Sequence, residues 1–208
     1  MDLAAVVLIV ALGDSTTAGT PHFKSPIEAA PNGSGDSTAP FTYRLGELHP
    51  EWTVLNRGVN GERSDQIAAR FDRDVLEHHP QIVVIIAGVN DVYQGRNVEW
   101  VTAQLSAMYA KAKRAGIPVV AGSIVPYNTA TPEQNARMHA INDWIRAEAA
   151  RDTNVTFVDT RKAAARADNI DLLSASPDGL HPDVNGYHHM GDALAPAIAA
   201  KVKREFKN

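Results

Sequence analysis

Four short runs rich in Val and Ile divide this chain, and they constrain its fold more than any other feature. They cover residues 3–12, 81–87, 117–122 and 154–158, and a weaker run covers residues 52–56. The first four runs are continuous rather than alternating, which is typical of strands buried on both faces of a parallel sheet. We therefore expect five buried strands.

Segments with helical spacing separate these strands. They cover residues 64–78, 98–115, 132–151 and 187–206. Their apolar residues recur as on one side of an amphipathic helix. Thr131 followed by Pro132 is typical of a helix cap with proline at the first helical position. Strands that alternate with helices predict right-handed crossovers and a three-layer α/β fold, here as one domain over residues 1–208.

The composition excludes several functional classes. The chain has 20 basic and 24 acidic residues, a net charge of −4 and no dense Lys/Arg cluster, so nucleic acid is not an expected partner. It contains no cysteine, which excludes disulfides, thiolate metal ligands and a cysteine nucleophile. There is no H-E-x-x-H motif for zinc, and the G-x-G of Gly33 to Gly35 follows no strand and lacks a third glycine. We therefore expect no metal and no cofactor.

The apolar N-terminus is interpreted as the first strand rather than as a signal peptide. Asp2 is acidic, no basic segment precedes the apolar run, and no cleavage site stands before Gly13. The run is also shorter than the roughly 20 residues that span a bilayer, so we expect no integral membrane segment. On this interpretation the protein is cytoplasmic. A secreted form from which a leader was removed stays open, and no oligomeric state is predicted.

Polar segments that contain glycine follow the predicted strands. Residues 13–15 (GDS), 56–61 (NRGVNG) and 88–91 (GVND) each follow a strand, and residues 178–182 (DGLHP) lie late in the chain. In open parallel sheets, ligands bind beyond the carboxyl ends of the strands. We therefore expect these four segments to meet at one edge of the sheet.

Several groups in these segments have the chemistry of acyl transfer. The hydroxyl of Ser15 becomes a nucleophile when a base removes its proton, and the imidazole of His181 is suited to do so. The imidazole in turn needs a carboxylate to fix its tautomer, a role that Asp178 would fill. The candidate donors to the oxyanion of the tetrahedral intermediate are the backbone N–H groups of Ser15 and Gly61 and the side-chain amide of Asn90.

On these residues the chain resembles the SGNH, or GDSL, hydrolase family, in particular its small bacterial esterases and lysophospholipases. The family carries a Ser, a Gly, an Asn and a His in separate blocks, and the matching residues here are Ser15, Gly61, Asn90 and His181, with Asp178 before the histidine. There is no G-x-S-x-G motif, which argues against the ordinary α/β-hydrolase turn. The resemblance implies a flavodoxin-like fold with a central five-stranded parallel sheet. It also implies hydrolysis of esters, thioesters or acyl groups on lipids or sugars without a metal.

The tetrapeptide GDST occurs twice, and its two serines receive different interpretations. Residues 13–16 end a predicted strand, whereas residues 35–38 lie in segment 20–40, which holds four Pro and two Gly and is predicted to be a long loop. Ser37 is therefore expected to be a turn residue, or a cap before a helix at residues 41–48, rather than a nucleophile.

The polar character of the neighbouring loops favours a small substrate. Loops 20–40 and 126–131 are the expected walls of the site, and their larger apolar residues are Phe23, Ile27 and Tyr127. No long apolar groove is evident, so we expect short acyl chains, as acetyl esters of small alcohols or of sugars. A lysophospholipase or thioesterase for longer chains is the alternative within this class. A non-catalytic ligand-binding module is the alternative from another class.

Overall fold

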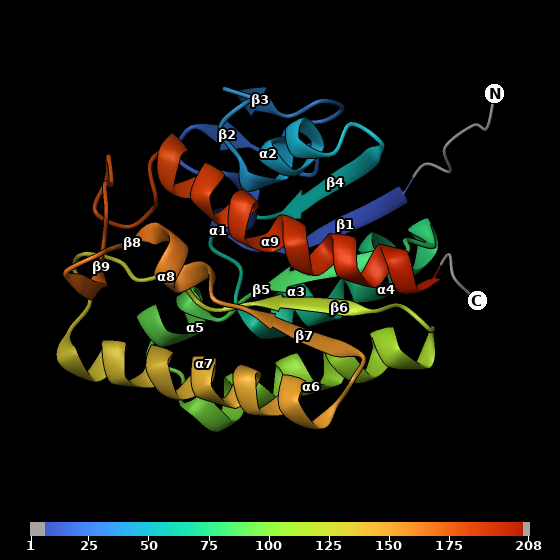
Figure 1. The fold of residues 1–208 in the computed structure, drawn as a ribbon. Helices are drawn as coiled ribbons and strands as arrows, with labels where there is room; N and C mark the ends of the chain where they lie inside the picture. Colours follow the sequence, from blue (N-terminus) through green and yellow to red (C-terminus); the bar gives the residue numbers. More distant parts are fainter. Residues whose placement is uncertain (1–6, 206–208) are drawn as a thin grey trace.

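A five-stranded parallel sheet forms the centre of the molecule in a computed structural model that describes residues 7–205 (Figure 1). In the order β4-β1-β5-β6-β7, the strands are β4 (Trp52–Gly58), β1 (Val7–Gly13), β5 (Ile82–Ile86), β6 (Val119–Gly122) and β7 (Val155–Val158). All five predicted strands are confirmed; the part of the first run at residues 3–6 lies outside the described residues.

The strand order determines where a ligand would bind. After β1 the chain adds β4 on one side of it and then β5 on the other. In open α/β sheets, the point at which the strand order reverses opens a crevice at the carboxyl ends of the strands. Here that point is the end of β1, which Ser15 follows.

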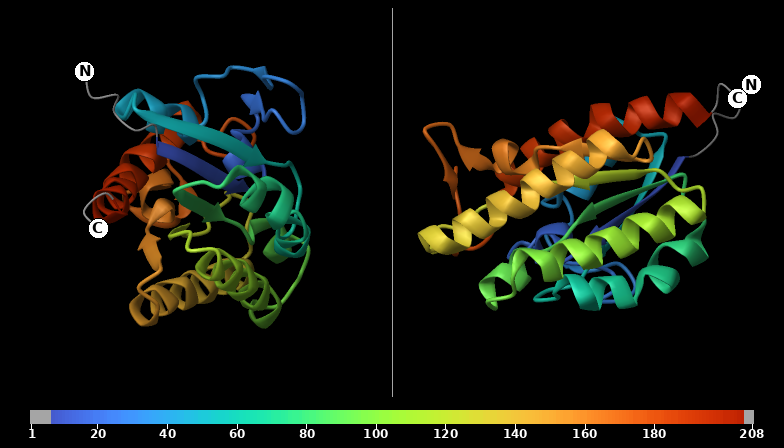
Figure 2. Two further views of the ribbon diagram at one scale, coloured as in Figure 1. Left: turned by 90° about the vertical axis from the view of Figure 1, so that its right-hand side faces the viewer. Right: turned by 90° about the horizontal axis from the view of Figure 1, so that it is seen from below.

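Helices cover both faces of the sheet, as the two views of Figure 2 show. One face carries α3 (Ser64–Ala69), α4 (Phe71–Asp74), the 3-10 helix η1 (Leu76–His78), α6 (Val98–Arg114) and α7 (Pro132–Arg151). The other face carries α2 (Phe41–Leu48), α8 (Thr160–Ala164) and α9 (Val184–Glu205). The three-layer α/β architecture predicted from the sequence is confirmed.

The residues of β1 divide between the two cores. Val10 and Leu12 pack toward the helices α3, α4, α6 and α7, whereas Ile9 and Ala11 pack toward α2 and α9. Successive side chains of a strand point to opposite faces, so a strand between two layers needs an apolar residue at every position. This is the physical reason for the continuous apolar runs in the sequence.

The helix predictions hold for three of the four segments. The helices α6, α7 and α9 occupy the predicted ranges to within three residues, and α7 is capped by Thr131, whose hydroxyl accepts the N–H of Gln134 at 3.2 Å. The prediction of one helix over residues 64–78 is wrong, because the chain breaks into α3, α4 and η1. The first break falls at Arg70, whose buried side chain turns toward the sheet. None of the helices within residues 7–205 combines the length and the apolar character that crossing a membrane requires.

Segment 20–40 is more ordered than the predicted long loop. It contains the antiparallel strands β2 (Phe23–Lys24) and β3 (Ser34–Gly35), and a second small hairpin is formed later by β8 (Ala165–Arg166) and β9 (Asn169–Leu173). Ser37 lies in an exposed turn, as predicted, but it does not cap α2, because the capping position is Pro40.

Candidate active site

Ser15 stands at the turn between β1 and the short helix α1 (Ser15–Ala18). Asp14 closes this turn by accepting the N–H of Thr16 at 2.9 Å. The helix lies so close to β4 that a Cβ at Gly58 would stand 2.1 Å from the backbone nitrogen of Ala18. Because glycine permits this approach, the turn is clamped between two strands and Ser15, only 6% exposed, has a fixed position.

His181 connects Ser15 with Asp178. Its Nε2 lies 2.9 Å from Ser15 Oγ, and its Nδ1 lies 2.7 Å from Asp178 Oδ2. An ionised carboxylate only accepts hydrogen bonds, so the ring donates Nδ1–H to Asp178 and leaves Nε2 to accept the serine hydroxyl. This is the tautomer that a general base for a serine nucleophile requires.

Asp178 is held ionised by its hydrogen bonds. Partial burial works to raise the pKa of Asp178, but the His181 ring and the backbone N–H groups of Leu180 and His181 outweigh it and lower the pKa below its ordinary value. Two further hydrogen bonds hold this segment: Ser176 of the same loop donates to the carbonyl of His181 at 2.6 Å, and Asn128 of a neighbouring loop donates its N–H to the carbonyl of Gly179 at 2.8 Å. These hydrogen bonds therefore fix the turn that carries His181.

Gly61 and Asn90, the two other predicted oxyanion donors, line the same pocket as Ser15 and His181. Gly61 has a φ of 74°, and a Cβ at this position would meet nothing within 4 Å, because the residue opens on a pocket. Asn90 belongs to α5 (Val89–Tyr93), and its Nδ2 donates to the carbonyl of Glu62 at 3.0 Å. This bond fixes the amide plane and leaves its second N–H for a ligand. The structure thus brings all five predicted site residues together.

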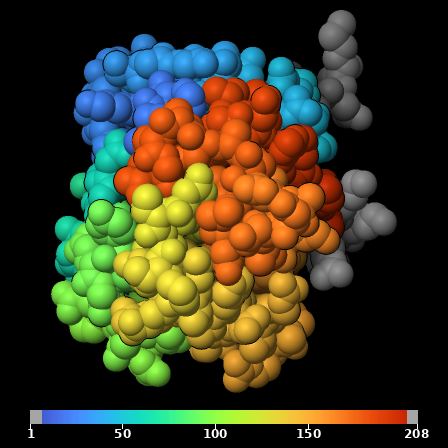
Figure 3. Space-filling view, turned by 90° about the vertical axis from the view of Figure 1, so that its left-hand side faces the viewer, coloured from blue at the N-terminus to red at the C-terminus, as the bar shows by residue number. Residues whose placement is uncertain are grey.

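The pocket at this site has a volume of about 300 Å³. It is lined by Ser15, Thr16, Asn60, Gly61, Val89, Asn90, Tyr93, Tyr127, Leu180 and His181. Figure 3 views the molecule from the side at which the strands end, where residues 20–40 (blue), 90–100 (green), 126–131 (yellow) and 165–182 (orange) lie on one face.

The prediction of the pocket walls is right for Tyr127 and wrong for Phe23 and Ile27, which do not line it. Phe23 instead packs inside its own hairpin, where its ring lies against the backbone of Gly33. The apolar walls missed from the sequence include Tyr93, 57% exposed, and Leu180, 37% exposed. Their positions carry a signal, because Tyr93 stands one helical turn after Asn90 and Leu180 directly precedes His181.

Two buried aspartates stand behind the site. Burial raises the pKa of Asp14 to about 7 against the opposing hydrogen bonds from Thr16, and its Oδ2 has no hydrogen-bond partner among the described residues. Asp91 accepts the N–H of Ser64 at 2.7 Å and its hydroxyl at 2.8 Å, while burial raises its pKa. Asp91 therefore joins α5 to the start of α3, next to Gly61.

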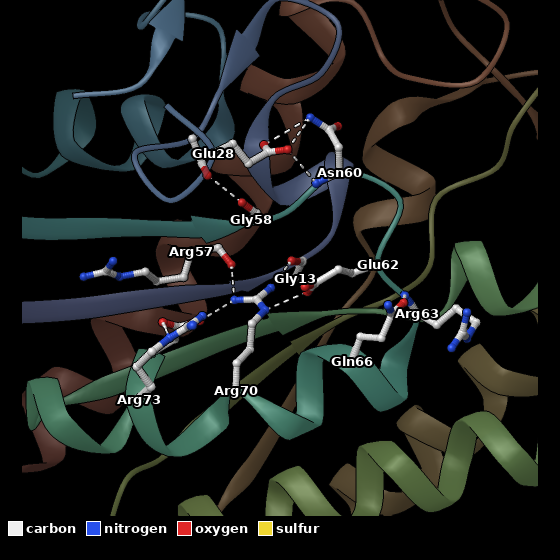
Figure 4. A network of polar contacts seen from close by, with 12 residues as sticks. Gly13, Glu28, Arg57, Gly58, Asn60, Glu62, Arg63, Gln66, Arg70 and Arg73 are labelled. Carbon is white, nitrogen blue, oxygen red and sulfur yellow. Dashed lines mark hydrogen bonds and ion pairs between the residues drawn. The ribbon is translucent and has the colours of Figure 1, made fainter. Parts of the chain in front are cut away.

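Arg70 ties together the ends of the two strands that lead into the site (Figure 4). Its guanidinium, 7% exposed, donates to the carbonyls of Gly13 at 2.7 Å and Arg57 at 2.9 Å. It also binds the carboxylates of Glu62 at 2.6 Å and Asp74 at 2.7 Å. The planar, five-donor guanidinium suits this role, because it satisfies four acceptors in fixed directions.

A parallel α/β sheet with a Ser, a His and an Asp joined at its carboxyl edge defines a class of serine hydrolases. The sequence profile of the GDSL-like lipase/acylhydrolase family matches residues 11–189, and the chain belongs to this family. It is accordingly a carboxylic ester hydrolase of the serine esterase type.

Individual proteins similar to this chain carry the names of esterases and lipolytic proteins. The chain is 27% identical over 198 residues to an acetylxylan esterase from Geobacillus stearothermophilus, covering 82% of this chain and 87% of the relative. It is 33% identical over 121 residues to an arylesterase from Vibrio mimicus, covering 58% and 56% of the two chains. A solved structure described as a lipolytic protein of the G-D-S-L family, from Desulfitobacterium hafniense, superposes with a TM-score of 0.72 at 26% identity, covering 91% of this chain and 98% of the other.

Proposed function

We propose that the chain, as one hydrolase domain over residues 1–208, cleaves esters with Ser15 as nucleophile, His181 as general base and Asp178 as the residue that orients the histidine. The observation that carries the proposal is the continuous hydrogen-bonded series from Ser15 Oγ through both nitrogens of His181 to Asp178, at 2.9 and 2.7 Å. Serine hydrolases on unrelated folds use the same geometry.

In the acylation step, Ser15 Oγ attacks the ester carbonyl carbon while His181 Nε2 takes the hydroxyl proton. The carbonyl electron pair moves to oxygen, and the resulting oxyanion accepts hydrogen bonds from the N–H groups of Ser15 and Gly61 and from the amide of Asn90. When the intermediate collapses, the bond to the alcohol oxygen breaks, and His181 returns its proton to that oxygen. The acyl group stays on Ser15.

Deacylation repeats these steps with water. His181 takes a proton from the water, whose oxygen attacks the acyl carbon and forms a second oxyanion in the same hole. Collapse then breaks the bond to Ser15 Oγ, which regains its proton from His181. The acid leaves, and the enzyme returns to its starting state.

The pocket supports a short acyl group, and we extend the proposal to acetyl-type esters, including acetylated sugars. Its volume of about 300 Å³ stands at the small end of ligand sites. The exposed ring of Tyr93 at the pocket offers an apolar face to a small leaving group such as a sugar ring. The relative from Geobacillus stearothermophilus is named as an acetylxylan esterase, which supports the same substrate class.

The duplicated GDST provides a matched test of the nucleophile. We expect Ser15→Ala to lower kcat for p-nitrophenyl acetate by more than about 10³-fold, because no oxygen nucleophile remains beside His181. Ser37→Ala, which changes an exposed turn in the same tetrapeptide, should keep wild-type turnover. Wild-type turnover by Ser15→Ala in a clean preparation would refute the assignment.

Acyl-chain length is tested by comparing kcat/KM for acetyl, octanoyl and acetylated-sugar esters. We expect the acetyl esters to be preferred, because the pocket is small. A steep rise of kcat/KM with chain length would instead favour a lysophospholipase or thioesterase. Labelling with a fluorophosphonate probe separates all of these enzymes from a non-catalytic binding module, since only an activated serine reacts.

A further inference from the structure

Glu28 reaches from segment 20–40 to the residue that precedes Gly61. Its Oε1 accepts the backbone N–H of Asn60 at 3.0 Å and the side-chain Nδ2 of Asn60 at 2.8 Å, and its Oε2 lies 3.0 Å from the same Nδ2 (Figure 4). Both carboxylate oxygens are thus directed at Asn60, although the two residues are 32 positions apart in the sequence. Both side chains are half-buried, so water competes less for these bonds than at an exposed site.

Other contacts of the same segment lead to the same place. The hydroxyl of Thr20 donates to Asn60 Oδ1, so the polar atoms of the Asn60 side chain and its backbone N–H all bind segment 20–40. Ser25, two positions after Phe23 in the hairpin, donates to the carbonyl of Gly58 at 2.5 Å. Tyr187 of α9 holds the start of the segment by donating to the carbonyl of Thr20 at 2.6 Å.

We infer that Glu28 is a positioning residue for ester hydrolysis, which aims the Asn60–Gly61 peptide so that the N–H of Gly61 points at the developing oxyanion. The inference rests on the proposed function, because it gives Glu28 a role only through the oxyanion hole. It assigns segment 20–40 to support of this hole rather than to the pocket wall, which it does not form.

The peptide plane between Asn60 and Gly61 determines where the N–H of Gly61 points. The direction of the Gly61 N–H depends on the backbone torsions of Asn60 and Gly61, and Gly61 has no Cβ to restrict them. Glu28 fixes Asn60 at its backbone and at its side chain, and this leaves the next peptide little freedom. An oxyanion donor is effective only when it is already oriented, because reorganisation during the reaction would offset its benefit.

A polarity exchange between the two residues tests this role. Glu28→Ala leaves the Asn60 donors without an acceptor, and Asn60→Asp places a second carboxylate against Glu28. We expect each change to lower kcat for p-nitrophenyl acetate by about 10- to 100-fold, less than the loss of an oxyanion donor itself, with KM within about threefold of wild type. In the double variant Glu28→Gln/Asn60→Asp, the glutamine amide donates to the new carboxylate while its oxygen accepts the backbone N–H. This variant should recover kcat to within about threefold of wild type.

A matched control lies in the same segment. Asp36→Asn removes the same charge, but within residues 7–205 the Asp36 carboxylate accepts hydrogen bonds only from the backbone N–H and the hydroxyl of Thr38, in an exposed turn. It should keep wild-type kcat. Wild-type kcat in Glu28→Ala, or no recovery of kcat in the double variant, would overturn the inference about Glu28. In that case, turnover that still depends on Ser15 would leave the proposed function standing. Recovery in the double variant supports the inference even if Glu28→Ala does not fold. Wild-type turnover that does not depend on Ser15 would overturn both proposals.

Discussion

Asp178 holds His181 at two points, its ring and its backbone. The carboxylate accepts Nδ1–H through Oδ2 at 2.7 Å and the backbone N–H of His181 through Oδ1 at 2.8 Å. The second bond fixes the turn between the two residues, and the first fixes the ring upon that turn. A separation of three positions is therefore sufficient for a carboxylate to reach the far nitrogen of the histidine.

The tautomer of His181 is the property that Asp178→Asn should change. An amide N–H in place of Oδ2 would face Nδ1 and favour the tautomer with the proton on Nε2, which cannot accept the proton of Ser15. We expect kcat to fall on the order of 10³-fold or more, with the fold intact. The control is Asp183→Asn, because among the described residues the Asp183 carboxylate accepts only the N–H of Gly186, at 2.8 Å, through an oxygen that asparagine retains. A loss below tenfold in Asp178→Asn would contradict the role.

Asn90 should act in the transition state rather than in substrate binding. Removing its amide in Asn90→Ala deletes one donor to the oxyanion, which we expect to lower kcat about 10²- to 10³-fold with little change in KM. Gln94→Ala, at the C-cap of the same helix, is the control, since among the described residues the exposed Gln94 side chain accepts only from Arg63. Steady-state kinetics with a short acetyl ester would measure kcat and KM for both variants. A change confined to KM would instead assign Asn90 to substrate binding.

The sheet and the site blocks could be predicted from the sequence because local pattern determines them. A strand such as β1 is apolar at consecutive positions for a reason that holds at every residue, namely burial on both faces. Ser15 and Asn90 follow such strands, Gly61 follows the weaker edge strand β4, and parallel topology brings strand ends to one edge. Predicting that the site residues converge therefore requires no knowledge of individual side-chain contacts.

The supporting contacts could not be predicted, because they join distant side chains. Glu28 looks like an ordinary loop carboxylate in the sequence, and its link to Asn60 appears only once the hairpin folds back on β4. Arg70 falls within a regular helical pattern, but four acceptors around a buried guanidinium override that pattern and break the helix. Apolarity alone predicts Phe23 at the pocket, whereas its hairpin buries the ring elsewhere.

Arg70→Lys should destabilise the fold, because an ammonium cannot replace the fork of a guanidinium. Lysine would reach only some of the acceptors and leave carbonyls and a carboxylate unsatisfied in a buried place. We expect the free energy of unfolding to fall on the order of 3 kcal/mol, measured by urea titration. Arg73→Lys is the matched control, since Arg73 binds the same Asp74 with a side chain that is 62% exposed. That change should cost less than about 1 kcal/mol. Equal losses of unfolding free energy in Arg70→Lys and Arg73→Lys would contradict this role of the buried guanidinium.

Asp14 should make the stability of the fold depend on pH. Burial raises its pKa from 3.8 to about 7. Below pH 3.8 the carboxyl is protonated in both the folded and the unfolded chain, so it does not change the free energy of unfolding. As pH rises from 3.8 to about 7, the unfolded chain releases the proton while the folded chain retains it, so stability falls. Above pH 7 the folded chain carries the full cost of the buried charge, roughly 4 kcal/mol from a shift of this size.

Asp14→Asn removes this dependence while keeping the shape of the side chain. The amide oxygen can still accept the Thr16 N–H that closes the turn before Ser15. We therefore expect the variant to gain stability over wild type progressively between pH 4 and pH 8, by a few kcal/mol at the upper end. Urea titrations at several pH values measure the difference, and Asp36→Asn, at an exposed turn, serves as control. If the stability curves of Asp14→Asn and wild type ran parallel across this range, Asp14 would not carry a raised pKa.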